Sequence, residues 1–509
     1  MTGPVGLPPT RFDYTAPAVA VAALGPVHLI GIGGAGMSGI ARMLRDRGVR
    51  VTGSDSRDSA ALQALAAEGI SVQVGHDVTA VTAAHTVVVS SAIREDNPEL
   101  TAARAAGLRV LHRSQALAAL AADSRCRIAV AGANGKTTTS SMLAAVLTAA
   151  GWDPSYAVGG DPVQLPVNAH LGQGDTFVIE ADESDGSFVG YRPHVALVTS
   201  VQPDHLDFYG TAAAVEAGYR AFVRTIEPGG LLVACVDDPG ARRLADAAAA
   251  AGVRVVRYGT SDDADVRLTD LDPTGLGARA SVHVDGTAYP LRLSVPGEHN
   301  LFNAAGVLAA AVSALPWDEP APARRAPERV TQWLDLLWRF RGVRRRFERV
   351  GDAGGVTIVD DYAHNPAKVR AAVATGRGAL PHGGRLVVVF QPHLYSRTRD
   401  FAAEFGAALA PADLVVVTDV YAAREDPIPG VTGALVADAV RAVRPQTEVK
   451  FVPGPADLVP TVIGAVRPGD LVITIGAGDI TGVGPALLER LELPDQRGGR
   501  VADPTVEAI

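Results

Sequence analysis

The chain has 509 residues, of which 47% are hydrophobic and 20% charged, a balance that predicts globular cores and argues against disorder. A net charge of −9 excludes a global basic field for nucleic acid, so any anionic ligand must be held by local groups. Only two cysteines, no run of apolar residues long enough to span a bilayer and no signal sequence predict a cytoplasmic protein without membrane insertion.

The first predicted elements form a parallel sheet. Residues 1–26 carry Pro, Gly and Thr without periodicity, which predicts a flexible N-terminal tail. Short apolar runs then alternate with helical patterns, as in βαβ units. Strands are predicted at Val27–Ile32, Val49–Gly53, Thr86–Ser90 and Leu108–Leu111, and helices at Met37–Arg47, Ser59–Ala67 and Asn97–Ala106.

Two further α/β units follow, and the length fits roughly three domains. We predict domains over residues 27–123, 124–338 and 339–493, then a flexible tail over residues 494–509. In the second unit we predict strands Thr176–Glu180 and Val195–Ser200 and helix Ala212–Thr225. In the third we predict strands Val356–Asp360, Arg385–Phe390, Leu414–Asp419 and Leu471–Ile475.

A first glycine cluster opens the chain's first helix. The run Gly31-Ile32-Gly33-Gly34-Ala35-Gly36 fits G-x-G-x-x-G, and Asp55 follows about 20 residues later. The pattern leaves two ligands open: an NAD(P) dinucleotide with Asp55 on its ribose, or another nucleotide diphosphate at the helix end. A turn with a purely structural role is the third interpretation.

A second glycine loop, Ala131–Thr139, lies between the apolar run Arg127–Val130 and a helical pattern. Backbone N–H groups at such a helix start hold phosphate oxygens, a lysine neutralises the outer phosphates, and a hydroxyl reaches Mg²⁺. Lys136 and Thr137 stand at those two places, and Lys136 is one of only three lysines in the chain. This loop favours a nucleotide other than NAD(P), because a dehydrogenase has no use for it.

Three polar motifs follow the loop. Glu180–Gly186 ends a predicted strand, where carboxylates face the ligand crevice and suit a hard cation. His205, in a Pro-Asp-His-Leu-Asp run, is predicted to contact metal or a terminal phosphate. Asn300 and Asn303 open an Ala-rich helix. One of them can cap that helix, and we favour Asn300 as a reader of an adenine edge.

The shortened loop G-x-x-G-K-T-T, with Val130 in place of the usual first glycine, resembles that of the Mur ligases, the ATP-dependent enzymes that build the peptide of bacterial peptidoglycan. The resemblance runs from about residue 27 to 489 and implies three α/β domains: an N-terminal Rossmann-like UDP-binding domain, a central P-loop ATPase-type domain and a C-terminal Rossmann-like domain. Further segments resemble the alanine-adding branch, among them 90–93, 180–188, 359–364, 390–398, 419–422, 425–430 and 476–480.

The resemblance also implies roles for individual residues. ATP would be bound by Gly132, Ala133, Asn134, Gly135, Lys136, Thr137, Thr138, Asn300 and Asn303, joined on domain closure by Arg346 and Asp361. The implied catalytic set is Lys136, Glu183, His205, Arg346 and Asp361, with Thr137, Glu183 and His205 at Mg²⁺. The UDP-sugar would be bound by Gly33, Gly34, Ala35, Gly36, Met37, Ser38, Asp55, Ser90 and Ser91, and the amino acid by His364, His393, Arg397 and Tyr421.

The activity implied by the resemblance joins L-alanine to the lactyl carboxylate of UDP-N-acetylmuramic acid through an acyl phosphate, in a monomer or homodimer that uses ATP and Mg²⁺. Ala133, Asn134, Ser200 and Asn365 depart from the family's usual residues. Other interpretations therefore stay open: a ligase of the same chemistry with another amine or a peptide (in cell-wall recycling, or as a divergent paralogue), an NAD(P)-dependent oxidoreductase, and an ATP-gated binding protein without catalysis.

Overall fold

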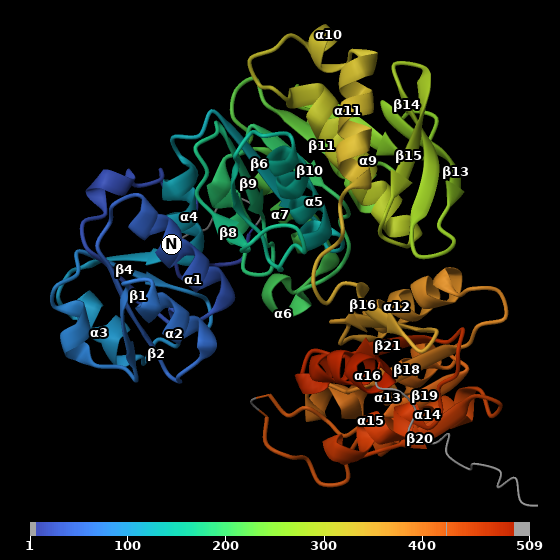
Figure 1. Ribbon diagram of the computed structural model, residues 1–509. Coiled ribbons are helices and arrows are strands. Elements are labelled where there is room, and N and C mark those ends of the chain that lie inside the picture. Colours follow the sequence, from blue (N-terminus) through green and yellow to red (C-terminus); the bar gives the residue numbers. More distant parts are fainter. Residues whose placement is uncertain (1–6, 424, 493–509) are drawn as a thin grey trace, which may run out of the picture. The chain divides into compact units, whose positions relative to one another are not determined.

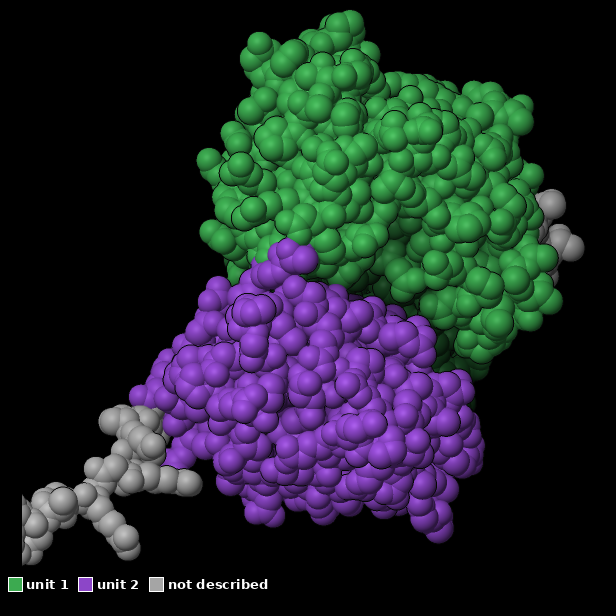
Figure 2. Space-filling view, turned by 90° about the vertical axis from the view of Figure 1, so that its right-hand side faces the viewer, with its two compact units in different colours: residues 1–273, 277–343 green, residues 274–276, 344–509 purple. Residues whose placement is uncertain are grey.

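The structure, a computed structural model, describes residues 7–423 and 425–492 and contains three sheets, each formed by its own stretch of chain (Figure 1). The chain divides into two compact units (Figure 2). The first comprises residues up to 273 together with 277–343 and holds two of the sheets, and the second comprises 274–276 and the residues from 344 onward. The three-domain α/β fold class predicted from the sequence is confirmed.

The N-terminal sheet has five parallel strands in the order β3-β2-β1-β4-β5. Its strands are β1 Val27–Ile30, β2 Val51–Asp55, β3 Ser71–Val74, β4 Thr86–Val89 and β5 Arg109–His112. Its helices are α1 Ala35–Asp46, α2 Ala60–Ala67, α3 Pro98–Ala105 and α4 Arg113–Ala121, with 3₁₀ turn η2 Val78–Val81. Four of these strands and three of these helices were predicted. β3 was missed because none of its residues is buried, so it shows no apolar run.

The segment before β1 differs from the predicted flexible tail. Tyr14 and Leu24 are buried in the core, η1 spans Val21–Ala23, and Gln115 Nε2 donates a hydrogen bond to Asp13 O at 3.0 Å. Aromatic and apolar side chains in this stretch gain burial by packing on the unit, which composition alone did not reveal. The predicted tails at residues 1–6 and 494–509 lie outside the described residues.

The central sheet has ten strands in the order β15-β14-β13-β12-β11-β10-β6-β9-β7-β8. The strands are β6 Cys126–Ala131, β7 Ser155–Ala157, β8 Ala169–His170, β9 Thr176–Glu180, β10 Val195–Val198, β11 Leu231–Cys235, β12 Arg254–Gly259, β13 Val266–Asp272, β14 Ala278–Val284 and β15 Thr287–Leu293. The helices are α5 Lys136–Ala149, α6 Leu206–Tyr209, α7 Ala212–Val223, α8 Pro239–Ala250, α9 Glu298–Ala314, α10 Ala321–Arg324 and α11 Pro327–Trp338, with η3 Ser187–Tyr191.

Two features of the central sheet position the site. Its inner strands β9, β6 and β10 are parallel neighbours, so their carboxyl ends meet at one edge. Helices α5 and α9 pack side by side against the sheet (Figure 1). One hydrophobic cluster joins Leu29 of the N-terminal sheet, Leu117 of its helix α4 and Ile179 of the central sheet, which is why both sheets share a compact unit.

The C-terminal sheet has six strands in the order β16-β17-β21-β18-β19-β20, parallel except for the β16–β17 hairpin. Its strands are β16 Glu348–Ala353, β17 Val356–Asp361, β18 Leu386–Phe390, β19 Leu414–Val417, β20 Glu448–Phe451 and β21 Leu471–Ile475. Its helices are α12 Pro366–Ala379, α13 Tyr395–Leu409, α14 Ala434–Val443, α15 Pro455–Ile463 and α16 Val483–Glu492, with η4 Asp479–Gly482. Over the described residues, no helix combines the length and apolar character needed to cross a membrane.

Candidate functional site

The loop between β6 and α5 has the backbone of a phosphate cradle. Gly132 and Gly135 both have positive φ, 144° and 86°. A Cβ on Gly132 would lie 2.0 Å from Thr199 Oγ1, and one on Gly135 would lie 2.6 Å from Asn303 Oδ1. Because only glycine fits these two places, the loop turns closely into the start of α5, as in a phosphate cradle.

Lys136 is held by the loop and by one carboxylate. Its Nζ donates to Gly132 O at 2.6 Å and lies 2.7 Å from Glu183 Oε2. Burial raises the pKa of Glu183 above its ordinary value, although the Lys136 ammonium opposes that shift. The pair thus places one positive and one negative group, both largely shielded from water, directly at the phosphate loop.

A second carboxylate, Glu180 at the end of β9, lies on the other side of the helix start. Thr137 Oγ1 donates to Glu180 Oε1 at 2.8 Å, while Gly159 N donates to Glu180 Oε2 at 2.5 Å. Ser140 Oγ also donates to Oε2, at 3.3 Å. Since the Thr137 hydroxyl donates its hydrogen to Glu180, its oxygen lone pairs remain as acceptors for a hard cation.

His205 stands near the same edge. Its Nε2 lies 3.8 Å from Glu183 Oε1, and its backbone is left-handed with φ 52° at the start of α6. Tyr209, from the same helix, donates its hydroxyl to Glu183 O at 2.7 Å. The structure therefore brings His205 to Glu183, whereas Thr137, predicted as their partner at the metal, is bonded to Glu180.

The two asparagines of α9 meet the loop from the opposite side. Asn303 Nδ2 donates to Asn300 Oδ1 at 3.1 Å, and Asn300 Nδ2 donates to Pro296 O at 2.7 Å. Asn303 Oδ1 faces Gly135, as the close approach above shows. Both side chains are buried, and Asn303 rather than Asn300 reaches the phosphate loop.

Three departures from the family pattern also have defined places. Asn134 N donates to Ser200 Oγ at 3.0 Å, and Asn134 Nδ2 donates to Gln202 Oε1 at 3.1 Å. Ala133 N donates to Ser200 O at 3.2 Å. Ser200 thus supports the loop backbone, so Ala133 and Asn134 are accommodated without loss of the cradle. Thr138 is half-buried in the first turn of α5.

The oxygen donors at this edge fit Mg²⁺ with a nucleotide triphosphate. Within residues 7–423 and 425–492, no cluster of three or more His, Cys, Asp or Glu is arranged to hold a metal ion. That is consistent with magnesium at a nucleotide, where phosphate oxygens and waters supply most of the ligands and the protein only one or two. Thr137, Glu183 and Glu180 have side-chain oxygens at this edge and would supply the protein's ligands to such an ion.

The N-terminal glycine cluster lies at the carboxyl ends of β1 and β2. Gly33 N donates to Asp55 Oδ2 at 2.9 Å, so Asp55 braces the cluster. Ser90 and Ser91 follow β4, the neighbour of β1, and therefore stand at the same edge. The predicted UDP-sugar residues are thus brought together, including the first turn of α1 with its buried Met37 and Ser38.

The predicted amino-acid residues come together within the second unit. The rings of His393 and Tyr421 stack with centroids 5.9 Å apart, and His364 lies 6.0 Å from His393. Arg397 Nη1 donates to His364 O at 3.3 Å. These side chains follow β17, β18 and β19, whose carboxyl ends share one edge of the sheet.

Arg346 and Asp361 belong to the same unit, and their contact with ATP stays a prediction. Asp361 accepts hydrogen bonds from Phe347 N and Ala363 N, both at 2.8 Å. Burial raises the pKa of Asp361 to about 6. The Arg346 guanidinium lies 5.8 Å from the Tyr362 ring.

Sequence reasoning missed Glu180 as a site residue, along with Tyr209 and the partners of Asp182 and Asp185. The available signal for Glu180 was its position as the last residue of a strand whose other four residues are all buried. That position places a carboxylate at the same edge as the phosphate loop, but of the Glu180–Gly186 run only Glu183 was predicted as a site residue.

These features define an α/β nucleotide-binding enzyme with a shortened phosphate loop in its middle sheet. Three family descriptions match the chain: "Mur ligase family, catalytic domain" over residues 26–125, "Mur ligase middle domain" over 130–311 and "Mur ligase, glutamate ligase domain" over 345–478. The chain belongs to the Mur ligase family.

Individual relatives are similar over nearly the whole chain. The UDP-N-acetylmuramate–L-alanine ligase of Kineococcus radiotolerans is 55% identical over 96% of this chain and 99% of its own length. The solved structure of the UDP-N-acetylmuramate-alanine ligase of Thermotoga maritima has a TM-score of 0.74 at 28% identity and covers 91% of this chain and 98% of that one. A murein peptide ligase of Psychrobacter arcticus shares the fold, with a TM-score of 0.62 at 24% identity over 92% and 99% of the two chains.

Proposed function

We propose that this chain joins L-alanine to the lactyl carboxylate of UDP-N-acetylmuramic acid, with hydrolysis of ATP to ADP and phosphate, in peptidoglycan precursor synthesis. The observation that carries the proposal is the 55% identity, over 96% of the chain, to a relative with that activity in its name. The phosphate loop, with its Lys136–Glu183 pair largely shielded from water, supplies the chemistry that this reaction needs.

The first step forms an acyl phosphate. A carboxylate does not condense with an amine in neutral water, so a carboxylate oxygen attacks the γ-phosphorus and ADP leaves. Both reactants are anions, and their repulsion must be cancelled where they meet. Lys136 at the loop provides one positive charge, and Mg²⁺ held beside Thr137 and Glu183 would supply further charge neutralisation at the phosphates. The Mur ligase family is ATP-dependent, which agrees with this assignment.

In the second step the neutral amine attacks the acyl carbon, phosphate leaves and the nitrogen loses a proton. His364 and Asp361 are the candidate acceptors. His364 Nδ1 lies 3.0 Å from Tyr362 O and so carries its hydrogen there, leaving Nε2 as an acceptor. Burial lowers the pKa of His364 to about 4, which keeps the imidazole neutral at pH 7. Both oxygens of Asp361 already accept backbone amides, so geometry favours His364.

The same proposal covers the remaining partners. His393, Arg397 and Tyr421 would hold the amino acid, and the glycine cluster with Asp55 would hold the UDP-sugar. We place the reaction in the cytoplasm, where ATP and the sugar nucleotide are both supplied. A monomeric or homodimeric state stays a prediction.

The alternative amine is a peptide, as in cell-wall recycling. The fold that this chain shares with a murein peptide ligase supports that second candidate. An oxidoreductase is disfavoured because Mur ligase family descriptions match residues 26–125, 130–311 and 345–478.

One assay tests the proposal. Purified protein receives ATP, Mg²⁺ and UDP-N-acetylmuramic acid, and phosphate release is followed on addition of L-alanine, glycine, L-serine or a tripeptide. Release that depends on L-alanine is expected. Release with the tripeptide alone would transfer the function to recycling, and no release with any amine would refute a ligase.

A further inference from the structure

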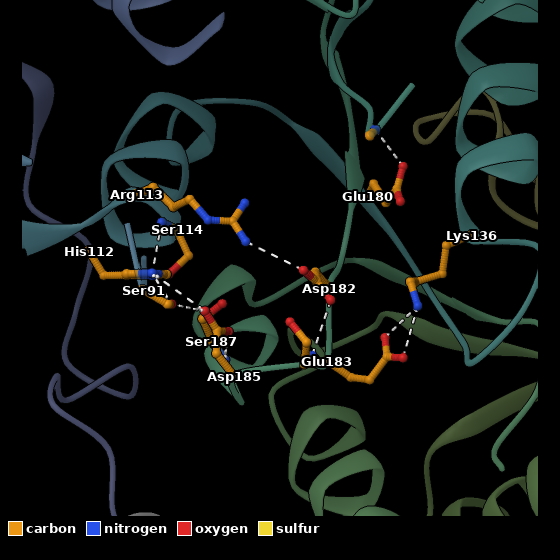
Figure 3. Close-up of polar contacts among 12 residues, drawn as sticks. Ser91, His112, Arg113, Ser114, Lys136, Glu180, Asp182, Glu183, Asp185 and Ser187 are labelled. Carbon is orange, nitrogen blue, oxygen red and sulfur yellow. Dashed lines mark hydrogen bonds and ion pairs between the residues drawn. The ribbon is translucent and has the colours of Figure 1, made fainter. Parts of the chain in front are cut away.

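The loop that follows β9 is tied in two directions. We call Asp182–Asp185 the acid loop. Glu183 in this loop faces Lys136, whereas Arg113 Nη2 donates to Asp182 Oδ2 at 3.4 Å. Figure 3 shows the two contacts on opposite sides of the loop, with Lys136 on one side and Arg113 on the other. Adjacent residues therefore link the phosphate loop of the central sheet to a helix of the N-terminal sheet.

A second link runs through Asp185. Ser91 Oγ donates to Asp185 Oδ2 at 2.5 Å and lies 3.0 Å from His112 Nε2 (Figure 3). His112 Nδ1 lies 2.8 Å from Ser114 Oγ and 3.4 Å from Ser114 N, in the cap of α4. Because Ser91 gives its hydrogen to Asp185, Ser91 Oγ accepts from His112, so the ring hydrogen is on Nε2 and Nδ1 accepts from Ser114. The hydrogen bonds then run in one direction: Ser114 donates to His112, His112 donates to Ser91, and Ser91 donates to Asp185.

The surroundings keep this chain of hydrogen bonds in one state. His112 is fully buried, and the rings of Phe12 and Tyr14 lie 5.5 and 5.3 Å from its imidazole. Burial lowers the pKa of His112 to about 4, so the ring is neutral at pH 7. Burial acts to raise the pKa of Asp185, but His112 and the hydrogen bonds from Ser187 and Ser91 hold it below its ordinary value.

The order of these residues is not that of a hydrolytic triad. In such a triad the serine gives its hydrogen to the histidine and becomes a nucleophile. Here the Ser91 hydroxyl gives its hydrogen to the carboxylate of Asp185 and receives one from His112. The serine is therefore held in place and not activated, which indicates a positioning role.

The Arg113 link reaches the glycine cluster itself. A Cβ on Gly36 would lie 3.6 Å from Arg113 Nη1, so the guanidinium stands at the first turn of α1. Arg113 and Asp182 therefore connect the acid loop to the glycine cluster, where the sugar nucleotide is proposed to bind.

We propose that the His112–Ser91–Asp185 chain, with Arg113–Asp182 beside it, is a clamp that fixes the acceptor carboxylate of the sugar nucleotide relative to the terminal phosphate of ATP. This inference rests on the proposed function. Reacting atoms must be held about 3–3.5 Å apart, and a misplacement of about 1 Å can cost about 10²-fold in rate. His112 and Asp185 are thus positioning residues that act through Ser91 and the acid loop.

The test uses the full-length protein with Asp185→Asn, which keeps side-chain size but leaves one oxygen for two donors. We expect kcat for alanine-dependent phosphate release to fall about 10- to 100-fold. The Kd values for ATP and for UDP-N-acetylmuramic acid, each measured alone by calorimetry, should stay within about threefold. Ser184→Ala, in the same loop but outside the chain of hydrogen bonds, is the matched control and should keep wild-type kcat.

A second pair of variants guards against misfolding. Ser91→Thr keeps a hydroxyl and should retain most of kcat, whereas Ser91→Ala should lose it. A kcat within twofold of wild type for Asp185→Asn overturns the clamp, and so does a matching loss of both affinities together with a lower Tm. Absence of alanine-dependent release from the wild-type protein would instead refute the proposed function, before any variant is compared.

Discussion

Glu180 orients the hydroxyl of the phosphate loop, and its replacement by glutamine tests that role. In the native arrangement Thr137 donates its hydrogen to Glu180, while Gly159 N and Ser140 Oγ occupy the other carboxylate oxygen. An amide has one oxygen, which Gly159 and Ser140 would retain. The amide nitrogen then faces Thr137 and donates to it. That bond occupies one of the two lone pairs of the hydroxyl oxygen and leaves the hydroxyl hydrogen without its native acceptor, so the oxygen is a poorer ligand for a cation.

The expected magnitude follows from the bonds that change. A hydrogen bond to a charged group contributes about 1.5–3 kcal/mol, and about 1.4 kcal/mol corresponds to tenfold in an equilibrium. For Glu180→Gln we expect the Mg²⁺ concentration at half-maximal phosphate release to rise about 10- to 100-fold. Calorimetric titration with ATP should show weaker binding in the presence of Mg²⁺ and nearly unchanged binding in EDTA.

The control is Asp207→Asn, which removes an exposed carboxylate from α6 and should leave the Mg²⁺ dependence as it is. Wild-type Mg²⁺ dependence in Glu180→Gln would refute the reasoning, because Thr137 would then not need its hydrogen directed at Glu180. An equal loss of ATP affinity with and without Mg²⁺ would also contradict it, since the effect would lie in the loop backbone and not in the cation's ligand.

Three further changes have defined outcomes. Lys136→Ala should lower turnover about 10²- to 10³-fold with a native circular dichroism spectrum, and near-normal turnover would contradict the assigned charge. Gly135→Ala, at φ 86° and 2.6 Å from Asn303 Oδ1, should abolish detectable ATP binding in calorimetry, whereas Gly210→Ala, with open space around it, should not. Because the pKa of folded His112 is about 4, below its unfolded value of about 6.5, protons favour the unfolded state as pH falls below 6.5. Urea unfolding should therefore show a loss of about 2 kcal/mol between pH 7 and 5 that His112→Gln lacks.

Strands buried on both faces could be predicted from the sequence. β9 at Thr176–Glu180 and β21 at Leu471–Ile475 match the prediction residue for residue, because both are mostly apolar and buried. Edge strands were harder. β20 at Glu448–Phe451 has no fully buried residue, and β3 likewise shows no apolar run. Such strands are specified by pairing with a neighbour, which periodicity does not report.

Glycine loops were predictable for a different reason. At Gly132 and Gly135 the positive φ and the close contacts permit only glycine. The two glycines are therefore a direct signal in the sequence. The side chains that support the phosphate loop have no comparable signal in the sequence. Ser200 accepts the Asn134 amide at 3.0 Å, but a serine after a strand fits many loops, and its contact depends on where β10 lies beside β6.

The partners of the acid loop could not be predicted from the sequence alone. Its carboxylates read as one cluster in the sequence, and the natural inference is a shared cation. In the structure Asp182, Glu183 and Asp185 point to three separate partners, Arg113, Lys136 and Ser91, because the loop crosses between two sheets. Which carboxylate faces which partner follows from the packing of those sheets into one core. Three like charges so close in sequence would repel if they shared one site, and separate donors let each be compensated where it lies. Glu183 is therefore the member of the acid loop that faces the phosphate loop, while its neighbours contact Arg113 and Ser91, as the proposed clamp requires.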